Sequence, residues 1–204
     1  MLPLDGKPPP QAIAPAGARF SWDKEAKYIS WMGFTFYMAW TANRGWAFYD
    51  IRHNGQRIIY ELSFQEALAH YAGTNPQQST TSYLDAAYQL GADAVELIPG
   101  YDCPAYATYM DTETGVYEGR MLSTANSVCF FEFDEDYPMA RHSSFGYVSN
   151  TKNIKFVVRA VYTVGNYDCT SFRDVSLVLN RLALTTSRYV QLRVLSRWKH
   201  PSNG

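Results

Sequence analysis

Histidine, cysteine and acidic side chains are the groups of this sequence most able to do chemistry, and their spacing limits what that chemistry can be. The four histidines are His53, His70, His142 and His200, and no two of them form an H-x-H or H-E-x-x-H pair. A histidine metal site needs such a local pair together with partners from elsewhere in the fold. We therefore interpret each histidine as structural or exposed. The sequence also lacks the glycine-rich phosphate loops and the G-x-S-x-G nucleophile elbow.

The acidic run FEFDEDYP places Glu132, Asp134 and Asp136 at alternate positions. Alternate side chains of a β-strand share one face, and a row of carboxylate oxygens is the kind of ligand that Ca²⁺ prefers. A solvated strand edge explains the same pattern without a ligand, and it is the interpretation we favour. The hypothesis of an extracellular calcium-binding adhesion domain depends on this acidic face alone.

The three cysteines are Cys103, Cys129 and Cys169, so at least one thiol is left over if two of them pair. A disulfide between Cys103 and Cys129 would contribute about 3 kcal/mol in the chain-entropy description. Buried free thiols explain these two residues equally well.

Composition favours one folded, β-rich domain. Of the 204 residues 47% are hydrophobic and 18% charged, which suits a packed core and argues against disorder. Aromatic residues reach 16%, and aromatic side chains suit pleated surfaces. A net charge of -1 gives no basic excess for nucleic acid. No apolar run reaches the ~18 residues of a membrane span, and the first residues do not have the pattern of a signal peptide.

Short strands separated by turns are expected along most of the chain. Asn54-Gly55 lies between two β-rich runs, Trp46–Arg52 and Gln56–Ser63, and predicts a hairpin. Residues 64–71 have helical spacing. The clearest strand is within Asn153–Asp168, where apolar residues at even positions alternate with a mixed set. Further strands are predicted at residues 27–40, 94–97, 105–110, 116–121, 127–134 and 146–148. This pattern predicts a β-sandwich.

Three segments of the sequence resemble copper amine oxidases. Thr163–Asp168, TVGNYD, is similar to the T-x-x-N-Y-[DE] cofactor motif of that family. Ser82–Gly91, SYLDAAYQLG, resembles the segment with its catalytic aspartate, and Tyr101–Asp111, YDCPAYATYMD, resembles its D-C-P-x-x-A-T-Y signature. The similarity extends from Lys7 to Asp168. It implies part of the family's catalytic β-sandwich, in truncated form.

The resemblance implies oxidative deamination of primary amines by O₂, giving aldehyde, ammonia and H₂O₂. Tyr167 would be the precursor of topaquinone, the quinone that forms a Schiff base with the amine. Asp85 would be the proton acceptor. Tyr71 would form a hydrogen bond with an oxygen of the quinone, and Asn166 would help to hold the quinone ring in place. The family is homodimeric, and the resemblance implies that most elements of that dimer are missing from this chain. The family also contains copper, and its disulfide corresponds to Cys103 and Cys129.

The sequence departs from the family after Asp168. The family's copper is held by an H-x-H pair and a third histidine downstream of the tyrosine, and only His200 follows Tyr167 here. We therefore expect residues 1–18 to be a linker, residues 19–172 to be the N-terminal part of the catalytic domain, and residues 173–204 to be a divergent, poorly ordered tail. The polypeptide as written should then lack copper and quinone. The alternative is a non-catalytic β-sandwich fragment, or the product of an incorrectly predicted gene, with no enzymatic role.

Overall fold

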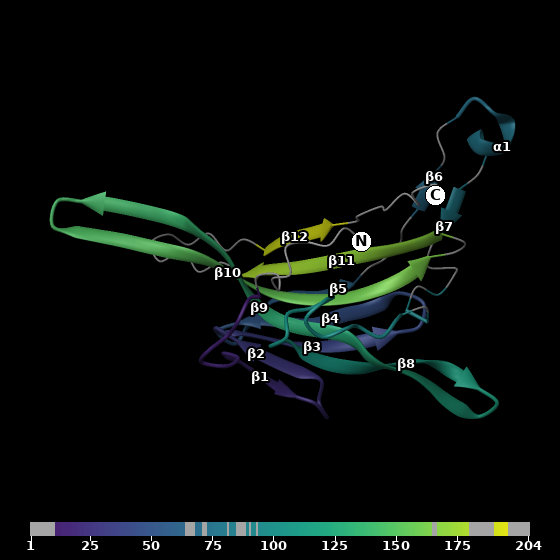
Figure 1. Ribbon diagram of the computed structural model, residues 1–204, viewed down its shortest axis with the longest axis horizontal. Helices are drawn as coiled ribbons and strands as arrows, with labels where there is room; N and C mark the ends of the chain where they lie inside the picture. The colour runs from purple at the N-terminus through teal and green to yellow at the C-terminus, as the bar shows by residue number, and fades with distance from the viewer. Residues whose placement is uncertain are drawn as a thin grey trace, which may run out of the picture.

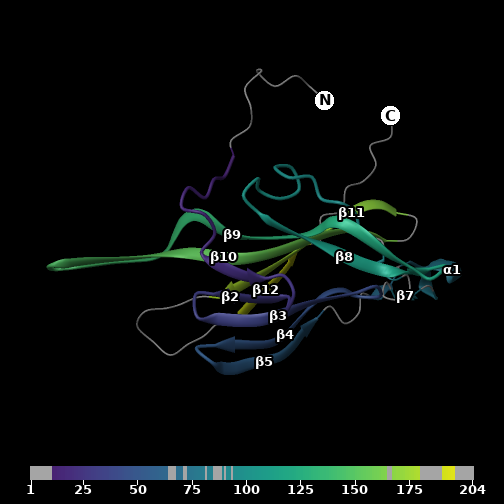
Figure 2. The same ribbon diagram turned by 90° about the horizontal axis from the view of Figure 1, so that it is seen from below.

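Two antiparallel β-sheets stacked face to face form the body of the protein (Figures 1 and 2). The computed structural model describes residues 11–63, 68–70, 73–80, 82–84, 89, 91–92, 94–164, 167–179 and 190–195. Each large sheet has five strands, and a two-stranded sheet and a short helix lie at one end. This arrangement confirms the predicted β-sandwich.

The first sheet is a meander in which each strand pairs with the next. Its strands are β1 (Phe20–Asp23), β2 (Tyr28–Trp31), β3 (Phe34–Thr41), β4 (Gly45–His53) and β5 (Gln56–Ser63). The predicted hairpin is present: Asn54 and Gly55 have φ values of 49° and 81°, and His53 pairs with Gln56. Two successive positive φ values match the right-handed twist of the flanking strands, which explains the Asn-Gly pair.

The second sheet has the order β12-β11-β10-β9-β8. Its strands are β8 (Thr108–Tyr117), β9 (Arg120–Ser144), β10 (Tyr147–Val164), β11 (Tyr167–Leu179) and β12 (Val190–Leu195). Residues 116–121, predicted as one strand, are instead the end of β8 and the start of β9 with a turn between them. Glu118 and Gly119 there have φ values of 48° and 74°, so they form a two-residue hairpin connection.

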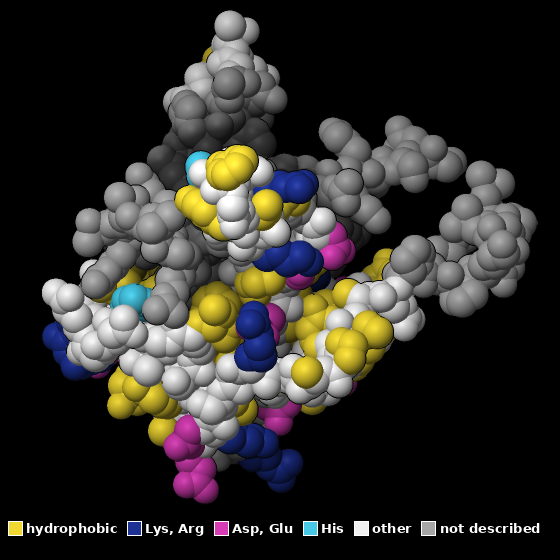
Figure 3. All heavy atoms as spheres, turned by 90° about the vertical axis from the view of Figure 1, so that its left-hand side faces the viewer, with side chains coloured by type: hydrophobic (Ala, Val, Ile, Leu, Met, Phe, Trp, Pro, Cys, Tyr) yellow, Lys and Arg dark blue, Asp and Glu magenta, His cyan; other side chains and the backbone are white. Residues whose placement is uncertain are grey.

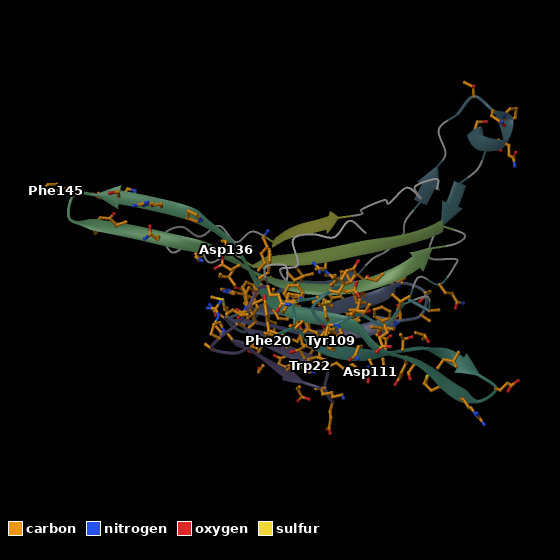
Figure 4. All side chains as sticks on the ribbon, viewed as in Figure 1. Phe20, Trp22, Tyr109, Asp111, Asp136 and Phe145 are labelled. Carbon is orange, nitrogen blue, oxygen red and sulfur yellow. A yellow bond between two sulfur atoms is a disulfide. The ribbon has the colours of Figure 1, made fainter. Side chains whose placement is uncertain are left out.

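The outer half of the β9–β10 hairpin projects away from the sandwich, with Phe145 at its end (Figures 1 and 4). Phe145 is fully exposed, and Tyr147 and Val148 are each 56% exposed. Figure 3 faces the molecule from this side and shows hydrophobic and basic side chains on the surface. The predicted strands at 127–134 and 146–148 are therefore parts of two much longer strands.

The core lies between the two large sheets and depends on the alternation in β10. Phe156, Val158 and Ala160 are at most 1% exposed and pack against the first sheet. Val157 and Val161 face the opposite way, into a second cluster that contains the cysteines. Both faces of β10 are thus covered, as its mixture of apolar residues at odd and even positions allows.

The small sheet pairs β6 (Leu68–His70) with β7 (Ser82–Leu84), and the helix α1 (Pro76–Ser79) lies between them in sequence. Helical spacing at residues 64–71 was thus misleading at 68–70, because pairing with β7 overrides a local helical preference. Residues 64–67 and 71 lie outside the described part.

The predicted boundary between residues 172 and 173 falls inside β11, which continues to Leu179 and pairs with β12. Two runs of the tail, at 175–179 and 190–195, are therefore in strands. The side chains there, and residues 180–189 and 196–204, are outside the described part. The expected poor order of residues 173–204 stays a prediction.

Candidate functional site

Tyr167 is the first residue of β11, at the end of the sandwich where β10 turns back. Its backbone pairs with Val164, the last residue of β10. The segment Thr163–Asp168, which resembles a cofactor motif, therefore spans the β10–β11 turn. Asn166 and the side chain of Tyr167 lie outside the described residues.

Asp85 and Tyr71 each follow a strand of the small sheet by one residue. In that sheet Leu68 pairs with Leu84 and His70 pairs with Ser82. Asp85 and Tyr71 themselves lie outside the described residues. The small sheet is at the same end of the molecule as the β10–β11 turn (Figures 1 and 2). The segments leading to all the predicted catalytic residues therefore share one end of the sandwich.

The chain from Gly91 to Leu97 connects this end to both large sheets through three backbone hydrogen bonds. Ala92 N–H donates to Ala42 O in the β3–β4 turn, at 2.8 Å. Val95 N–H donates to Val161 O in β10, at 3.1 Å, and Leu97 N–H donates to Asn126 O in β9, also at 3.1 Å. The segment after Asp85 is thus held by the first sheet and then by the second.

A disulfide joins Cys103 to Cys129, as the resemblance implied. Both cysteines are at most 2% exposed, and they pack beside Leu97. Arg159 of β10 donates to the carbonyl of Asp102 and lies over the ring of Phe131. The disulfide and this guanidinium together fasten the loop before β8 to the outer face of the second sheet.

Two tyrosine hydroxyls lie close to this loop. Burial and the charge of Glu132 raise the pKa of Tyr106, whose hydroxyl donates to the backbone carbonyl of Glu132 at 2.7 Å. Burial and the charge of Asp102 raise the pKa of Tyr109. The Tyr109 hydroxyl is buried and has no hydrogen-bond partner among the described residues. Both hydroxyls therefore stay neutral near pH 7.

Glu132 joins the two sheets, which differs from the solvated edge that its sequence favoured. Its carboxylate accepts hydrogen bonds from Trp31 Nε1 of the first sheet at 2.5 Å and from Arg19 at 2.8 and 3.1 Å. Burial acts to raise the pKa of Glu132, but these hydrogen bonds and the Arg19 charge hold that pKa below its usual value. Glu132 is therefore ionised and paired at neutral pH.

The carboxylate of Asp134, the next residue on the predicted acidic face, is held by two hydrogen bonds within the sheet. Asp134 accepts a hydrogen bond from Lys152 Nζ at 2.5 Å, which lowers the pKa of Asp134, and a second from the Asp136 N–H at 2.9 Å. Asp136 has a φ of 59°, where the register between β9 and β10 shifts. The shift interrupts the alternation, so the three carboxylates do not continue as one regular face.

The described residues contain no group of three or more His, Cys, Asp or Glu side chains arranged to hold a metal ion. Two histidines with described surroundings lie in different sheets. His53 of β4 packs on Phe34 with ring centroids 4.3 Å apart, and His142 of β9 lies against Tyr147 on the projecting hairpin. The described part of the chain therefore supplies no copper ligand set.

Sequence reasoning missed the Arg19–Glu132–Trp31 cluster and the tight packing of Gly91. The cluster joins residues separated by more than a hundred positions, and no local pattern marks such a pairing. Gly91 lies within a segment already singled out for Asp85, but its need for space depends on a distant turn.

Comparison of the sequence with known proteins gives matches to amine oxidases over most of this chain. The profile of the copper amine oxidase enzyme domain matches residues 23–172. A copper amine oxidase of Bipolaris victoriae is 44% identical over 167 residues, which cover 81% of this chain and 23% of that protein. The bovine liver isozyme of primary amine oxidase is 36% identical over 169 residues, 80% of this chain and 22% of its own length.

Solved structures agree with the sequence relatives. The crystal structure of Aspergillus nidulans amine oxidase is 49% identical, with a TM-score of 0.74, over 87% of this chain and 24% of that chain. The Pichia pastoris lysyl oxidase structure is 40% identical, with a TM-score of 0.75, over 85% of this chain and 23% of that one. The chain thus spans about a quarter of the length of the relatives it matches. None of the helices among the described residues has the length and apolar character needed to cross a membrane.

Proposed function

Because this chain belongs to the copper amine oxidase family, we propose that it supplies the proton acceptor and the cofactor tyrosine for the oxidative deamination of primary amines. The overall reaction converts a primary amine, O₂ and water into an aldehyde, ammonia and H₂O₂. The observation that supports it is the extent of the family match, which spans residues 23–172 and so includes Asp85 and Tyr167.

Tyr167 is proposed as the precursor of topaquinone, which when formed supplies an electrophilic carbonyl that a phenol lacks. Asp85 is proposed to accept the proton from the substrate carbon next to nitrogen, because a carboxylate can act as a general base on that carbon. Tyr71 would donate a hydrogen bond to an oxygen of the cofactor ring. Asn166, next to Tyr167 in the sequence, would restrict the orientation of that ring.

We assign no step to copper within this chain. The described residues hold no suitable ligand cluster, and the sequence contains no H-x-H pair. We therefore propose that the 204-residue polypeptide expressed by itself forms no quinone. The test is to incubate it with Cu²⁺ and air and then with phenylhydrazine. A phenylhydrazone absorbance that Tyr167→Phe abolishes would contradict this proposal.

The catalytic roles need the remaining parts of an oxidase, so we test them in a hybrid enzyme. In it, residues 23–172 of this chain replace the matching segment of the Aspergillus nidulans amine oxidase. Tyr167→Phe should abolish both the phenylhydrazine-reactive quinone and turnover. Asp85→Asn should leave quinone formation intact and lower turnover by about 10²–10⁴-fold, because an amide does not accept the proton.

Matched controls separate these roles from general damage. Tyr60→Phe changes a tyrosine that is 72% exposed on β5, and Asp136→Asn keeps a residue type that tolerates positive φ. Both should leave quinone content and turnover near the unmodified values. Near-normal turnover of Asp85→Asn would reject Asp85 as the proposed base.

We also propose that the chain takes part in a homodimer like that of the family, and that the projecting β9–β10 hairpin is one of its contacts. Phe145, Tyr147 and Val148 are large apolar side chains exposed outside the sandwich, and such clusters commonly mark contact surfaces. Light scattering of the hybrid enzyme should show a dimer. Phe145→Asp should shift it toward monomer, and an unchanged dimer would exclude this hairpin as an essential contact.

A further inference from the structure

Gly91 is packed against backbone with no room for a side chain. A β-carbon built on it would lie 2.0 Å from the carbonyl oxygen of Thr41, 2.8 Å from Gly45 N and 3.0 Å from the carbonyl oxygen of Ala42. The three atoms belong to the last residue of β3, the first residue of β4 and the turn between them. Because they are backbone atoms, they cannot rotate away as the end of a flexible side chain would.

Space, and not backbone conformation, is the reason for glycine at this position. The φ of Gly91 lies outside the left-handed range, whereas Gly45 in the facing turn has a φ of 81°. Close approach of two chain segments is one of the established uses of glycine. Here it allows the Ala92 N–H to reach the Ala42 carbonyl at 2.8 Å.

The segment that begins at Gly91 continues across the sandwich as a brace, defined here as residues Gly91–Leu97. Ala94 is 7% exposed and belongs to the core between the sheets. Val95 then bonds to Val161, three residues before the end of β10 and close in sequence to Tyr167. Leu97 is 1% exposed and packs in the cluster around the disulfide.

We propose that this brace fixes the position of Asp85 relative to Tyr167, and that Gly91 is a positioning residue for the amine oxidase reaction. The inference rests on the function proposed above. Asp85 directly follows β7 and precedes the first residue of the brace by six positions along the chain. The hydrogen bond to Val161 attaches the same brace to the strand that leads to Tyr167. Tight docking at Gly91 therefore limits how far the two segments can move apart.

The size of the expected effect follows from the contact. Gly91→Ala must separate the brace from the turn by about 1 Å before the 2.0 Å approach reaches the shortest β-carbon contacts seen in proteins. Misplacement of a catalytic group by about 1 Å can lower a rate by about 100-fold. We expect a decrease of 10- to 100-fold in kcat with an unchanged quinone content.

The first experiment measures hydrogen exchange in the full 204-residue chain. Gly91→Ala should accelerate exchange of the Ala92 and Val95 amides at least tenfold and leave the β8–β9 amides unchanged. Gly115→Ala is the matched control, since a β-carbon added to Gly115 would meet no atom within 4 Å and its φ is not positive. Unchanged protection of both brace amides in Gly91→Ala would overturn the proposal.

A second variant is needed if Gly91→Ala also accelerates exchange of the β8–β9 amides, because that result would indicate general destabilisation. Val95→Pro removes the N–H that bonds to Val161 and adds no atom at the β3–β4 turn. Val95 is 39% exposed, so little packing is lost. Faster exchange at Ala92, with β8–β9 unchanged, supports the brace. Unchanged exchange at Ala92 rejects it.

The third experiment asks whether Gly91 acts through Asp85, with benzylamine as the probe substrate of the hybrid enzyme. Gly91→Ala should lower kcat in the otherwise unmodified hybrid but cause no further loss in an Asp85→Asn background, because the two changes then affect one step. A further loss in that background overturns the proposal while the proposed function stands. Normal turnover of Asp85→Asn alone rejects the proposed role of Asp85, on which this inference rests.

Discussion

Removing the ring of Phe156 should destabilise the protein more than most other single substitutions in its sandwich. Phe156 lies in β10 and is fully buried. Its ring centroid is 5.3 Å from that of Phe20, 5.6 Å from Trp31, 5.8 Å from Phe36 and 6.3 Å from Phe130. These four rings come from strands of both sheets. Phe156→Ala therefore empties the centre of the contact that holds the sheets together.

The magnitude follows from burial and from the ring contacts. Deleting a buried phenylalanine ring costs about 3–5 kcal/mol, with the higher values where the surroundings cannot collapse. Each aromatic pair is worth about 0.5–1.5 kcal/mol beyond its buried area. The neighbouring rings are fixed on hydrogen-bonded strands, so we expect a loss of at least about 4 kcal/mol, a large share of the ~5–15 kcal/mol of a typical domain.

Urea unfolding followed by tryptophan fluorescence is the assay, since the chain has five tryptophans. With an m-value of about 2 kcal/mol/M, a loss of about 4 kcal/mol lowers the midpoint by about 2 M. Tyr101→Ala is the control, because this aromatic ring lies in the loop before β8, is 75% exposed and should change stability by less than about 0.5 kcal/mol. A Phe156→Ala loss below about 1.5 kcal/mol would refute the packing argument.

Two further predictions concern the cross-links of the fold. Replacing Cys103 and Cys129 together by alanine should lower the free energy of unfolding in urea by about 3.5 kcal/mol, the chain-entropy value for their separation of 26 residues. Cys169→Ala is the control, because it should leave the disulfide in place. A loss below about 1 kcal/mol in the double variant would contradict this prediction. The pKa of Glu132 is lowered from 4.5 in the folded state, so its stabilising contribution is present above pH 4.5 and is lost as pH falls through the folded pKa. Thermal unfolding should therefore separate the unmodified chain from Glu132→Gln more at pH 7 than at pH 3, and an equal separation at both would show that the carboxylate charge is not involved.

Local patterns in the sequence were sufficient where a structural feature depends on neighbouring residues. The Asn54-Gly55 turn needs two successive positive φ values, which this pair adopts easily. The apolar even positions of β10 face the core between the sheets, because strand side chains alternate. The family relationship was also accessible, since the segments around Asp85, Cys103 and Tyr167 carry it in their order and spacing.

Local patterns failed where pairing with a distant strand decided the outcome. Residues 64–71 have helical spacing, yet Leu68–His70 form a strand because β7 is available to pair with them. Residues 116–121 have the composition of a strand, but Glu118 and Gly119 form a turn that no Asn-Gly pair marks. Register and strand ends depend on the partner strand, which a window of sequence does not contain.

The sequence by itself determined the fold class, the family and the identity of the proposed catalytic residues, because these follow from residue types and their order along the chain. Only the tertiary structure decided that Glu132 pairs with Arg19 and Trp31, and that Gly91 must be glycine. Both depend on atoms that lie far apart in the sequence and within a few ångströms of each other in space. A carboxylate or a glycine acquires such a role from what the other sheet places against it.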